Sequence, residues 1–459
     1  TEVMLESPGR VAVTTPHGTF GPADVLVTNP DGAHAFLAGG YLYTDLSVTS
    51  RVGRYRSQID GPVPPLELLP EGRIASMALH DDAGEREAVV VSHARYAASA
   101  VDFAALVASP SAGALSVVDI TDPHNPVIRG GVTLPVPFDP VDVAMRGNVA
   151  YVLATGASFT NLDVAGEGQS ALFAVTLTRS TADNSVACTI GGNTLLPTTG
   201  TDTARSLAIL DDVAFAALGG SGLASISLLD ATNPVSLGAH KTFFVNGAAR
   251  DISVDHVSVA AHQLLVGSDA LGTAIAVDPV RAELPAMSSF SPSFLELAAA
   301  APSRGVLADG QLRTAAFDGA PRVVAAVPSL VSNRTMAHAA AGLSVFAGVA
   351  SGVGDPPNDA VLELVSLPTA AAPVAIDAVS LYPGSAVAKT GLIDDVSVTA
   401  FAMNIVSGNI ELGNDALVLV ELPFPVVTRT DPADGALGVA TPAPIEIDFA
   451  RPVDTASAS

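Results

Sequence analysis

A few histidines and carboxylates have a spacing that could serve metal chemistry. His80, Asp81 and Asp82 are consecutive in the sequence, and His93 comes after the short apolar run that follows them. If the two histidines lie on paired strands joined by the acidic turn, they offer the nitrogen and oxygen ligands that metal ions take. An exposed acidic turn with two unrelated imidazoles is the favoured interpretation, because charged turns usually face solvent.

Four long stretches lie between apolar strands, at residues 93–114, 155–170, 350–360 and 403–415, and the last three are rich in oxygen-bearing side chains. Oxygen is the ligand atom that calcium prefers, but no stretch has the spacing of a known calcium loop. A solvated acidic rim is therefore favoured, calcium stays the alternative, and no other cofactor is expected. The oxygen donors are Asn161, Asp163, Glu167, Asp355, Asn358, Asp359, Asn404, Asn409, Asn414 and Asp415.

Larger side chains in the first two stretches are candidates for contact with a partner. They are Arg95, Tyr96, Phe103 and Phe159. Aromatic and arginine side chains often supply most of the binding energy of an interface. Aromatic side chains also pack long loops onto the body of a protein, and this second use is favoured for Tyr96, Phe103 and Phe159.

Enzyme motifs are not found in the sequence. G-x-S-x-G, H-E-x-x-H and Walker-type patterns do not occur, and GGSGL at 219–223 lacks the final glycine that an esterase elbow needs. Asp119, Asp122 and Asp142 recur at strand ends and turns, where carboxylates accept backbone N–H bonds. We therefore expect structural roles for these three aspartates.

The composition indicates a globular β protein rather than a nucleic-acid or membrane protein. Apolar residues make up 49% of the 459 residues, while 40 glycines and 33 prolines interrupt the chain too often for long helices. No apolar run is long enough to span a bilayer. The formal charge of −25 disfavours nucleic acid and anionic membrane surfaces as partners. The single cysteine, Cys188, excludes an internal disulfide.

One pattern returns seven times between residues 64 and 423: a turn, an apolar strand, a tight turn and a second apolar strand. The clearest copy runs from Leu115 to Ala154, and the copies of its second half begin near residues 74, 141, 204, 249, 294, 334 and 387. This spacing is typical of four-stranded propeller blades. Runs such as VAYVLA fit strands that are covered on both faces. The sequence predicts an all-β fold, a seven-bladed β-propeller closed by an N-terminal strand.

The ends of the repeat region predict how the ring closes. The seventh copy ends with a third strand at Ala416–Leu422, and the prolines after it prevent a fourth. We expect residues 64–70 (PPLELLP) to supply the missing strand. The strand directions then place both flanking segments on one face and the four long loops on the other. These loops belong to blades six, seven, one and two, which are neighbours in a ring, so they form one crescent.

Three segments resemble known families. Leu115–Pro126 (LSVVDITDPHNP) and Val141–Ala154 resemble the LVIVD-repeat family of bacterial exported and surface proteins. VLVTNPDG within residues 1–44 resembles the end of an IPT/TIG immunoglobulin-like domain, and PADGALGV after residue 423 resembles the start of a bacterial Ig-like domain. The resemblances imply partial immunoglobulin-like β modules at 1–44 and 424–459, a linker at 45–63, a propeller at 64–423, and a longer parent chain cut inside both modules.

The favoured function is a non-enzymatic interaction or adhesion module of a large bacterial surface or secreted protein. Its localisation would be extracellular, its partner a protein or glycan bound to the long loops, and its neighbours the flanking modules of the same chain. One alternative is a segment of a secreted toxin, similar to Rhs proteins, or of a hydrolase whose active domain lies outside this chain. Another is a catalytic disc, which requires two or more carboxylates or histidines to converge at the channel mouth.

Overall fold

The chain is all-β in every part that the structure describes, so the predicted fold class is confirmed at this level. None of the described residues lies in a helix that could cross a membrane. The computed structural model describes residues 3–7, 10–13, 21–28, 34–43, 46–53, 74–82, 84–93, 113–156, 169–199, 202–245, 248–260, 263–277, 286–290, 296–301, 304–308, 312–317, 320–327, 332–340, 343–350, 359–367, 373–383, 386–402, 405–406, 409–410, 416–422, 427–431 and 446–449.

Within these residues the main structural unit is an antiparallel sheet of four strands, and there are seven such sheets, numbered here in chain order. Sheets 1 to 4 are β6 (Ile74–Asp82), β7 (Glu85–Ser92), β8 (Ala114–Asp119), β9 (Val127–Thr133); β10 (Phe138–Arg146), β11 (Val149–Gly156), β12 (Ser170–Arg179), β13 (Val186–Leu196); β14 (Ser206–Leu210), β15 (Val213–Ala217), β16 (Leu223–Ser227), β17 (Val235–His240); and β20 (His256–Ala260), β21 (Gln263–Ser268), β22 (Thr273–Val277), β23 (Ala286–Phe290).

Sheets 5 to 7 have the same plan, and shorter ladders of two strands complete the described chain. The three sheets are β24 (Glu296–Ala301), β25 (Arg304–Ala308), β26 (Leu312–Ala316), β27 (Arg322–Ala326); β28 (Ser332–Ala340), β29 (Leu343–Ala350), β30 (Asp359–Ser366), β31 (Val374–Pro383); and β32 (Ala386–Ile393), β33 (Val396–Ala402), β36 (Ala416–Glu421), β5 (Ser50–Gly53). The ladders are β1 (Val3–Ser7) with β2 (Arg10–Val13), β3 (Gly21–Thr28) with β4 (His34–Tyr43), β18 (Thr242–Val245) with β19 (Ala248–Asp251), β34 (Ile405–Val406) with β35 (Asn409–Ile410), and β37 (Val427–Asp431) with β38 (Glu446–Phe449).

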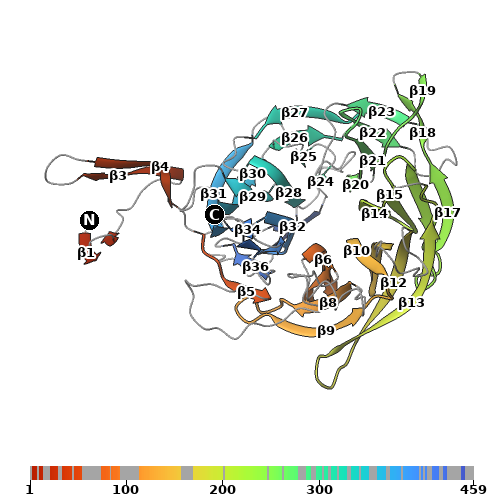
Figure 1. The fold of residues 1–459 in the computed structure, drawn as a ribbon, viewed down its shortest axis with the longest axis horizontal. Coiled ribbons are helices and arrows are strands. Elements are labelled where there is room, and N and C mark those ends of the chain that lie inside the picture. The colour runs from red at the N-terminus through yellow and green to blue at the C-terminus, as the bar shows by residue number, and fades with distance from the viewer. Residues whose placement is uncertain are drawn as a thin grey trace.

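The seven sheets follow one another around a central axis, an arrangement like that of a propeller (Figure 1). The first strand of each sheet lies innermost and contacts the first strand of the next, and β32 of sheet 7 contacts β6 of sheet 1. The fourth strands lie at the rim, coloured from orange to blue around the figure. Since each sheet lies between two others, its middle strands are covered on both faces, which explains the apolar runs in the sequence.

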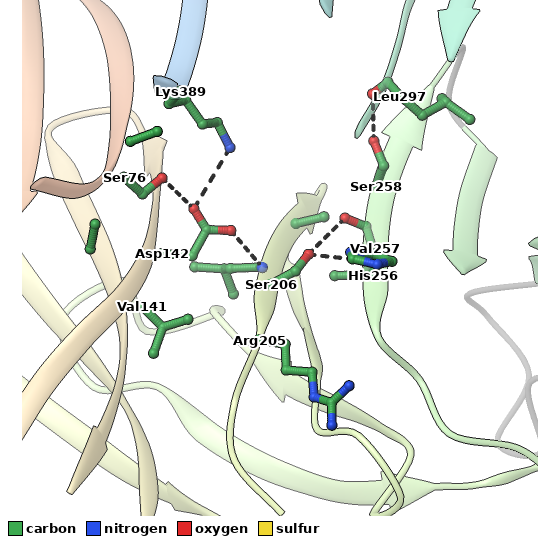
Figure 2. Close-up of a pocket in the computed structure, with 14 residues that line it drawn as sticks. Ser76, Val141, Asp142, Arg205, Ser206, His256, Val257, Ser258, Leu297 and Lys389 are labelled. Carbon is green, nitrogen blue, oxygen red and sulfur yellow. Dashed lines mark hydrogen bonds and ion pairs between the residues drawn. The ribbon is translucent and has the colours of Figure 1, made fainter. Parts of the chain in front are cut away.

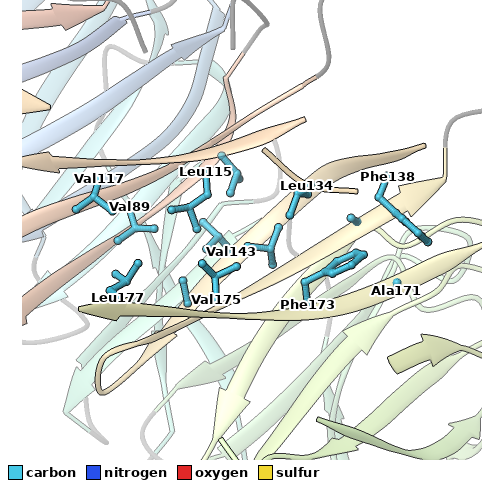
Figure 3. Close-up of a cluster of buried hydrophobic side chains, with 14 of the residues drawn as sticks. Val89, Leu115, Val117, Leu134, Phe138, Val143, Ala171, Phe173, Val175 and Leu177 are labelled. Carbon is cyan, nitrogen blue, oxygen red and sulfur yellow. The ribbon is translucent and has the colours of Figure 1, made fainter. Parts of the chain in front are cut away.

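Apolar side chains fill the space between consecutive sheets. Figure 3 draws the cluster between sheets 1 and 2, where Val89 and Leu115 of sheet 1 face Phe173 and Val175 of sheet 2. The ring of Phe138 meets that of Phe173 edge to face, with 5.0 Å between centroids. Each such side chain contributes roughly 1.5–3 kcal/mol on burial, so the contacts between sheets are a main source of stability.

The turns between the third and fourth strands have a repeated construction. In residues 122–126 (DPHNP) and 230–234 (DATNP), the carboxylates of Asp122 and Asp230 accept the N–H two residues later. Their main-chain carbonyls accept the N–H three residues later. Aspartate side chains stabilise turns in this way, so the geometry agrees with the structural role expected for Asp122.

These turns also bind the rim of the preceding sheet. The N–H of Gly192 on β13 donates to the carbonyl of Thr232 at 2.6 Å, which joins sheets 2 and 3. A Cβ at the neighbouring Gly191 would lie 2.7 Å from the main-chain oxygen of Thr232, so this close approach needs glycine. In the same way the hydroxyl of Ser50 on β5 donates to the carbonyl of Pro123, which joins sheets 7 and 1.

Asp119 ends β8, the apolar third strand of sheet 1. Its carboxylate accepts the N–H of Thr121 at 3.0 Å and the Arg129 guanidinium at 3.0 and 3.1 Å. Burial by itself would raise the pKa of Asp119, but these hydrogen bonds and the Arg129 charge together hold that pKa below its ordinary value. Asp119 therefore stabilises the fold above the pKa that it has in the unfolded chain, and this contribution is lost as the pH falls through the lower pKa of the folded state.

The strand that completes sheet 7 is not the predicted one. Ser50–Gly53 pairs with Ala416–Leu419, and the N–H of Thr49 extends the ladder by donating to the Leu419 carbonyl at 2.9 Å. Residues 64–70 lie outside the described residues, and the position beside β36 that they were predicted to take is held by β5. That prediction is wrong, and the predicted linker of residues 45–63 contains a strand.

The backbone explains why β5, and not residues 64–70, pairs with β36. Residues 64–70 contain three prolines, which have no N–H to donate to a ladder, whereas β5 contains none. In β5 the side chain of Val52 is buried between sheets 7 and 1. Arg51 reaches the opposite way and donates to the carbonyl of Leu381 on the rim strand of sheet 6 at 3.0 Å.

The register of β5 fixes where the chain joins the ring. Ser50 lies opposite Leu419 and Gly53 opposite Ala416, so β5 begins at the edge where β36 ends. We call this edge the tether face. The opposite edge, where second strands end and third strands begin, is called the loop face. The predicted boundaries of the flanking modules stay predictions; β1 to β4 and β37 with β38 lie in those segments.

Replacing Val52 with aspartate tests the importance of β5. Val52 is 2% exposed, and a carboxylate in this apolar interface costs about 3 kcal/mol, so we expect a clearly lower midpoint of urea unfolding. Val235→Asp is the matched control, because Val235 is also on a fourth strand but is 53% exposed. Equal midpoints for the two variants would contradict the role of β5.

Candidate functional site

Most residues predicted to contact a partner lie outside the described residues, so their grouping stays a prediction. These are Arg95, Tyr96, Phe103, Phe159, Asn161, Asp163, Glu167, Asp355, Asn358, Asn404, Asn414 and Asp415. Of Asp359 and Asn409 only the backbone is described: Asp359 begins β30 and Asn409 begins β35.

The strands that carry these stretches are described, and they fix where the stretches are attached. Each of the four stretches joins the second strand of a sheet to its third, as the pairs Ser92–Ala114, Thr155–Ser170, Ala350–Asp359 and Phe401–Ala416 indicate. All four attachments are therefore on the loop face, in sheets 1, 2, 6 and 7.

The histidines considered as metal ligands do not form one site. His80 pairs in register with Glu87, whereas His93 follows β7, whose last residue pairs with Ile74 at the opposite end of the same two strands. The Nδ1 of His93 lies 2.9 Å from the carboxylate of Asp139 on sheet 2. Among the described residues, no three histidine, cysteine or acidic side chains are grouped so that they could hold a metal ion.

A cavity of about 230 Å³ lies where the innermost strands begin, toward the loop face, and Figure 2 draws the residues that line it. Its lining comes from sheets 1, 2, 3, 4, 5 and 7. Polar side chains interrupt the apolar first strands at this level. They are Ser76, Asp142, Arg205, Ser206, His256, Ser258 and Lys389.

Asp142 is the centre of the hydrogen bonding in this cavity. Its Oδ1 accepts the hydroxyl of Ser76 at 2.7 Å and the N–H of Val143 at 2.9 Å, and its Oδ2 accepts the N–H of Leu207 at 2.9 Å. The ammonium of Lys389 lies 3.7 Å from Oδ1. One buried carboxylate therefore joins the first strands of sheets 1, 2, 3 and 7 (Figure 2).

Two serines continue these contacts from sheet to sheet. The hydroxyl of Ser206 donates to the carbonyl of Val257 at 3.1 Å and accepts the N–H of the same residue at 3.0 Å. The hydroxyl of Ser258 donates to the carbonyl of Leu297 at 2.8 Å. Sheets 3, 4 and 5 are thereby connected through side chains on their first strands (Figure 2).

A second buried carboxylate lies behind the lining. Asp255 forms an ion pair with Arg205 and accepts the N–H of Asp269 at 2.8 Å. The side chain of Arg205 is 45% exposed, whereas that of Asp255 is 6% exposed. The Nε2 of His256 lies 3.1 Å from the carboxylate of Asp269, which is not among the lining residues.

The sequence did not identify this cavity, although it placed Asp142 on an innermost strand and expected a structural role for it. The other polar lining residues are far apart in the chain. Aligning the repeats by their first strands would have brought Ser76, Asp142, Ser206 and Lys389 to the same level. The polar break near the start of an otherwise apolar strand is the signal that could have found them.

The carboxylate and the imidazole of the lining are both engaged with other strands or turns. The described lining residues include one carboxylate, Asp142, and one imidazole, His256, and each already has a partner on another strand or turn. The hydroxyl of Ser76 donates directly to Asp142, without an imidazole between them.

Comparison with known proteins gives no family. No protein-family model matches the chain, and no curated protein sequence matches it. Similar solved structures include the computationally designed protein Ika8, with 11% identity, a TM-score of 0.43, and coverage of 77% of this chain and 97% of that one.

Two natural structures are similar to the same degree. One is Chaetomium thermophilum Sqt1 bound to the N-terminus of ribosomal protein L10, with 13% identity, a TM-score of 0.44, and coverage of 76% of this chain and 97% of the other. The second is in a Mitotic Checkpoint Complex, with 10% identity, a TM-score of 0.45, and coverage of 80% and 99%. Likeness at this level carries no inference about partners.

Replacing Asp142 with asparagine tests its structural importance. The amide has one acceptor oxygen in place of two, so a buried N–H or hydroxyl loses its acceptor, and we expect a loss of about 2–3 kcal/mol in the free energy of unfolding. Asp183→Asn is the matched control, because Asp183 accepts only local hydrogen bonds in an exposed turn. If urea unfolding gave the same midpoint for both variants, Asp142 would not hold the sheets together.

Proposed function

We propose that this chain is a seven-bladed β-propeller that acts as a non-enzymatic interaction module. The observation that carries the proposal is the register of β5 against β36. It attaches the preceding and following segments at the tether face and leaves the loop face without a covalent tether. A rigid disc held from one side presents its other side to a partner.

Closure of the ring by β5 is part of this proposal. Its support is the antiparallel pairing of Ser50–Gly53 with β36 and the contact between β32 and β6. Pairing with β5 covers the edge of β36, and β5 then takes the outer position that the fourth strand has in the other six sheets. The disc would then be rigid enough to hold its loops in fixed positions.

The partner-binding surface in this proposal is the crescent of long connections at residues 94–112, 157–168, 351–358 and 403–415. Its support is the attachment of all four to the loop face of sheets 6, 7, 1 and 2, which are consecutive around the ring. Their oxygen donors and aromatic residues suit a protein or a glycan, and in the alternative the oxygen donors of the acidic rim bind calcium.

The cellular setting is proposed from the sequence. The LVIVD-like segment Leu115–Pro126 and the immunoglobulin-like patterns at both ends support an extracellular or surface-exposed bacterial protein. The charge of −25 disfavours nucleic acid and anionic membranes as partners. In this setting the flanking modules are spacers that hold the disc away from the cell.

Loop replacement tests the partner-binding surface. Residues 94–112 and 157–168 are replaced by Gly-Ser linkers of equal length, and binding of the full chain to a glycan array and to purified extracellular matrix proteins is measured. We expect every ligand bound by the wild type to bind at least tenfold more weakly to the replaced chain, because its contacts are removed.

The control replaces residues 180–185, the turn between β12 and β13 on the tether face. It should leave binding unchanged. Binding that survives both loop replacements, or that is lost equally in the control, would refute the assignment of the interaction to the loop face.

A further inference from the structure

The rim strand of sheet 6 begins with exposed apolar side chains. In β31, Val374 is 54% exposed and Ile376 is 36% exposed. Val374 pairs with Ser366, which is on the same face of β30 as Leu362 and Leu364 because successive residues of a strand alternate between faces. Both leucines belong to the buried cluster between sheets 6 and 7. Val374 therefore faces sheet 7, but sheet 7 does not cover it.

A turn lies at the corresponding position of other sheets. In sheets 1 and 3, the turn between the third and fourth strands lies against the rim strand of the preceding sheet, as the bonds from Ser50 to Pro123 and from Gly192 to Thr232 show. Sheet 7 is different, because its third strand β36 and its fourth strand β5 are not consecutive in the chain. The start of β31 is therefore open to cover by another segment.

The segment that leads into β5 reaches this position. Leu46 is 4% exposed and belongs to the same cluster as Val379 of β31 and Leu422, which follows β36, so the chain before β5 runs to the tether face. β31 begins at this face too, since fourth strands start where third strands end. β4 ends at Tyr43, three residues before Leu46, and three residues span at most about 10 Å. The end of β4 accordingly contacts β31 (Figure 1).

The two strands also suit each other in composition. The sequence of β4, HAFLAGGYLY, is largely apolar and aromatic and has no acidic residue, lysine or arginine. The first three residues of β31, 374–376, are valine, alanine and isoleucine. The next residue, Asp377, is 6% exposed, and its carboxylate accepts the N–H of Ala378 at 2.8 Å. In a chain with a formal charge of −25, these two uncharged strands can approach without repulsion between like charges.

We propose that the start of β31 is the docking site of the hairpin formed by β3 and β4. The hairpin covers Val374 and Ile376, as the turns of sheets 1 and 3 cover the rim strands before them. Modules of one chain move relative to one another unless an apolar interface holds them, so this contact fixes the direction in which the preceding segment leaves the disc. The inference goes beyond the proposed function, since it needs no partner at the loop face.

Distances between spin labels, measured by pulsed electron paramagnetic resonance on the full chain, test the docking. The labels are attached at Leu26→Cys on β3 and Leu195→Cys on β13, because these side chains are 60% and 51% exposed. Cys188→Ala removes the single native thiol, so that only the two chosen positions are labelled. A docked hairpin has one orientation relative to the disc, and we expect one narrow distribution of distances.

Two substitutions locate the interface. Val374→Asp places a charge where the hairpin docks, and desolvation of that charge opposes docking, so the distribution should become at least twice as broad. Ile376→Asp should act in the same direction. Val235→Asp is the matched control and should leave the distribution unchanged, because Val235 also begins a fourth strand and is 53% exposed, but it belongs to sheet 3. Thermal unfolding confirms that each variant is folded, and if Val374→Asp is not, Ile376→Asp decides.

A broad distribution in the labelled chain that keeps Val374 and Ile376 overturns the proposal, because the hairpin would then move freely. A distribution for Val374→Asp as narrow as that for Val235→Asp also overturns it, because the start of β31 would then have no part in orienting the hairpin. Neither result bears on the loop-replacement experiment, which measures ligand binding at the opposite face, so the two proposals fail independently.

Discussion

The antiparallel pairing of β5 with β36 is the interaction on which the rest of the structure depends. Without it sheet 7 has three strands, and the apolar interface that contains Val52 is open to water. The pairing joins segments more than 360 residues apart, as the bond from the Glu421 N–H to the Thr49 hydroxyl illustrates. Such a contact has a large cost in chain entropy, which main-chain hydrogen bonds and the burial of Val52 together offset.

The sheets are then held at both edges of the ring. At the tether face, arginines reach from one sheet to the next: Arg86 pairs with Asp395 at 3.2 Å across sheets 1 and 7, and Arg146 pairs with Asp212 across sheets 2 and 3. At the loop face, the carboxylate of Asp142 connects neighbouring sheets. It accepts hydrogen bonds from neutral donors and pairs with Lys389. The polar contacts at the two ends of the strands and the apolar packing between those ends together fix the position of each sheet relative to its neighbours.

The sequence allowed the all-β class to be predicted, because runs such as VAYVLA suit strands buried on both faces and turns such as DPHNP mark strand ends. The strand beside β36 was assigned wrongly, because hydropathy favours the leucines of 64–70 while a ladder depends on N–H groups that prolines lack. The cavity could not be read from the chain, since Ser76, Asp142 and Lys389 meet only when the innermost strands surround one axis.

Hydrogen–deuterium exchange of the full chain, read by mass spectrometry, tests the central pairing most directly. If β5 completes sheet 7, the amides of residues 50–53 exchange slowly, at rates similar to those of residues 416–419, and residues 64–70 have no share in that protection. Fast exchange at 50–53 together with strong protection at 64–70 would contradict the account, because the strand assigned beside β36, and the face assignments that follow from it, would then be wrong.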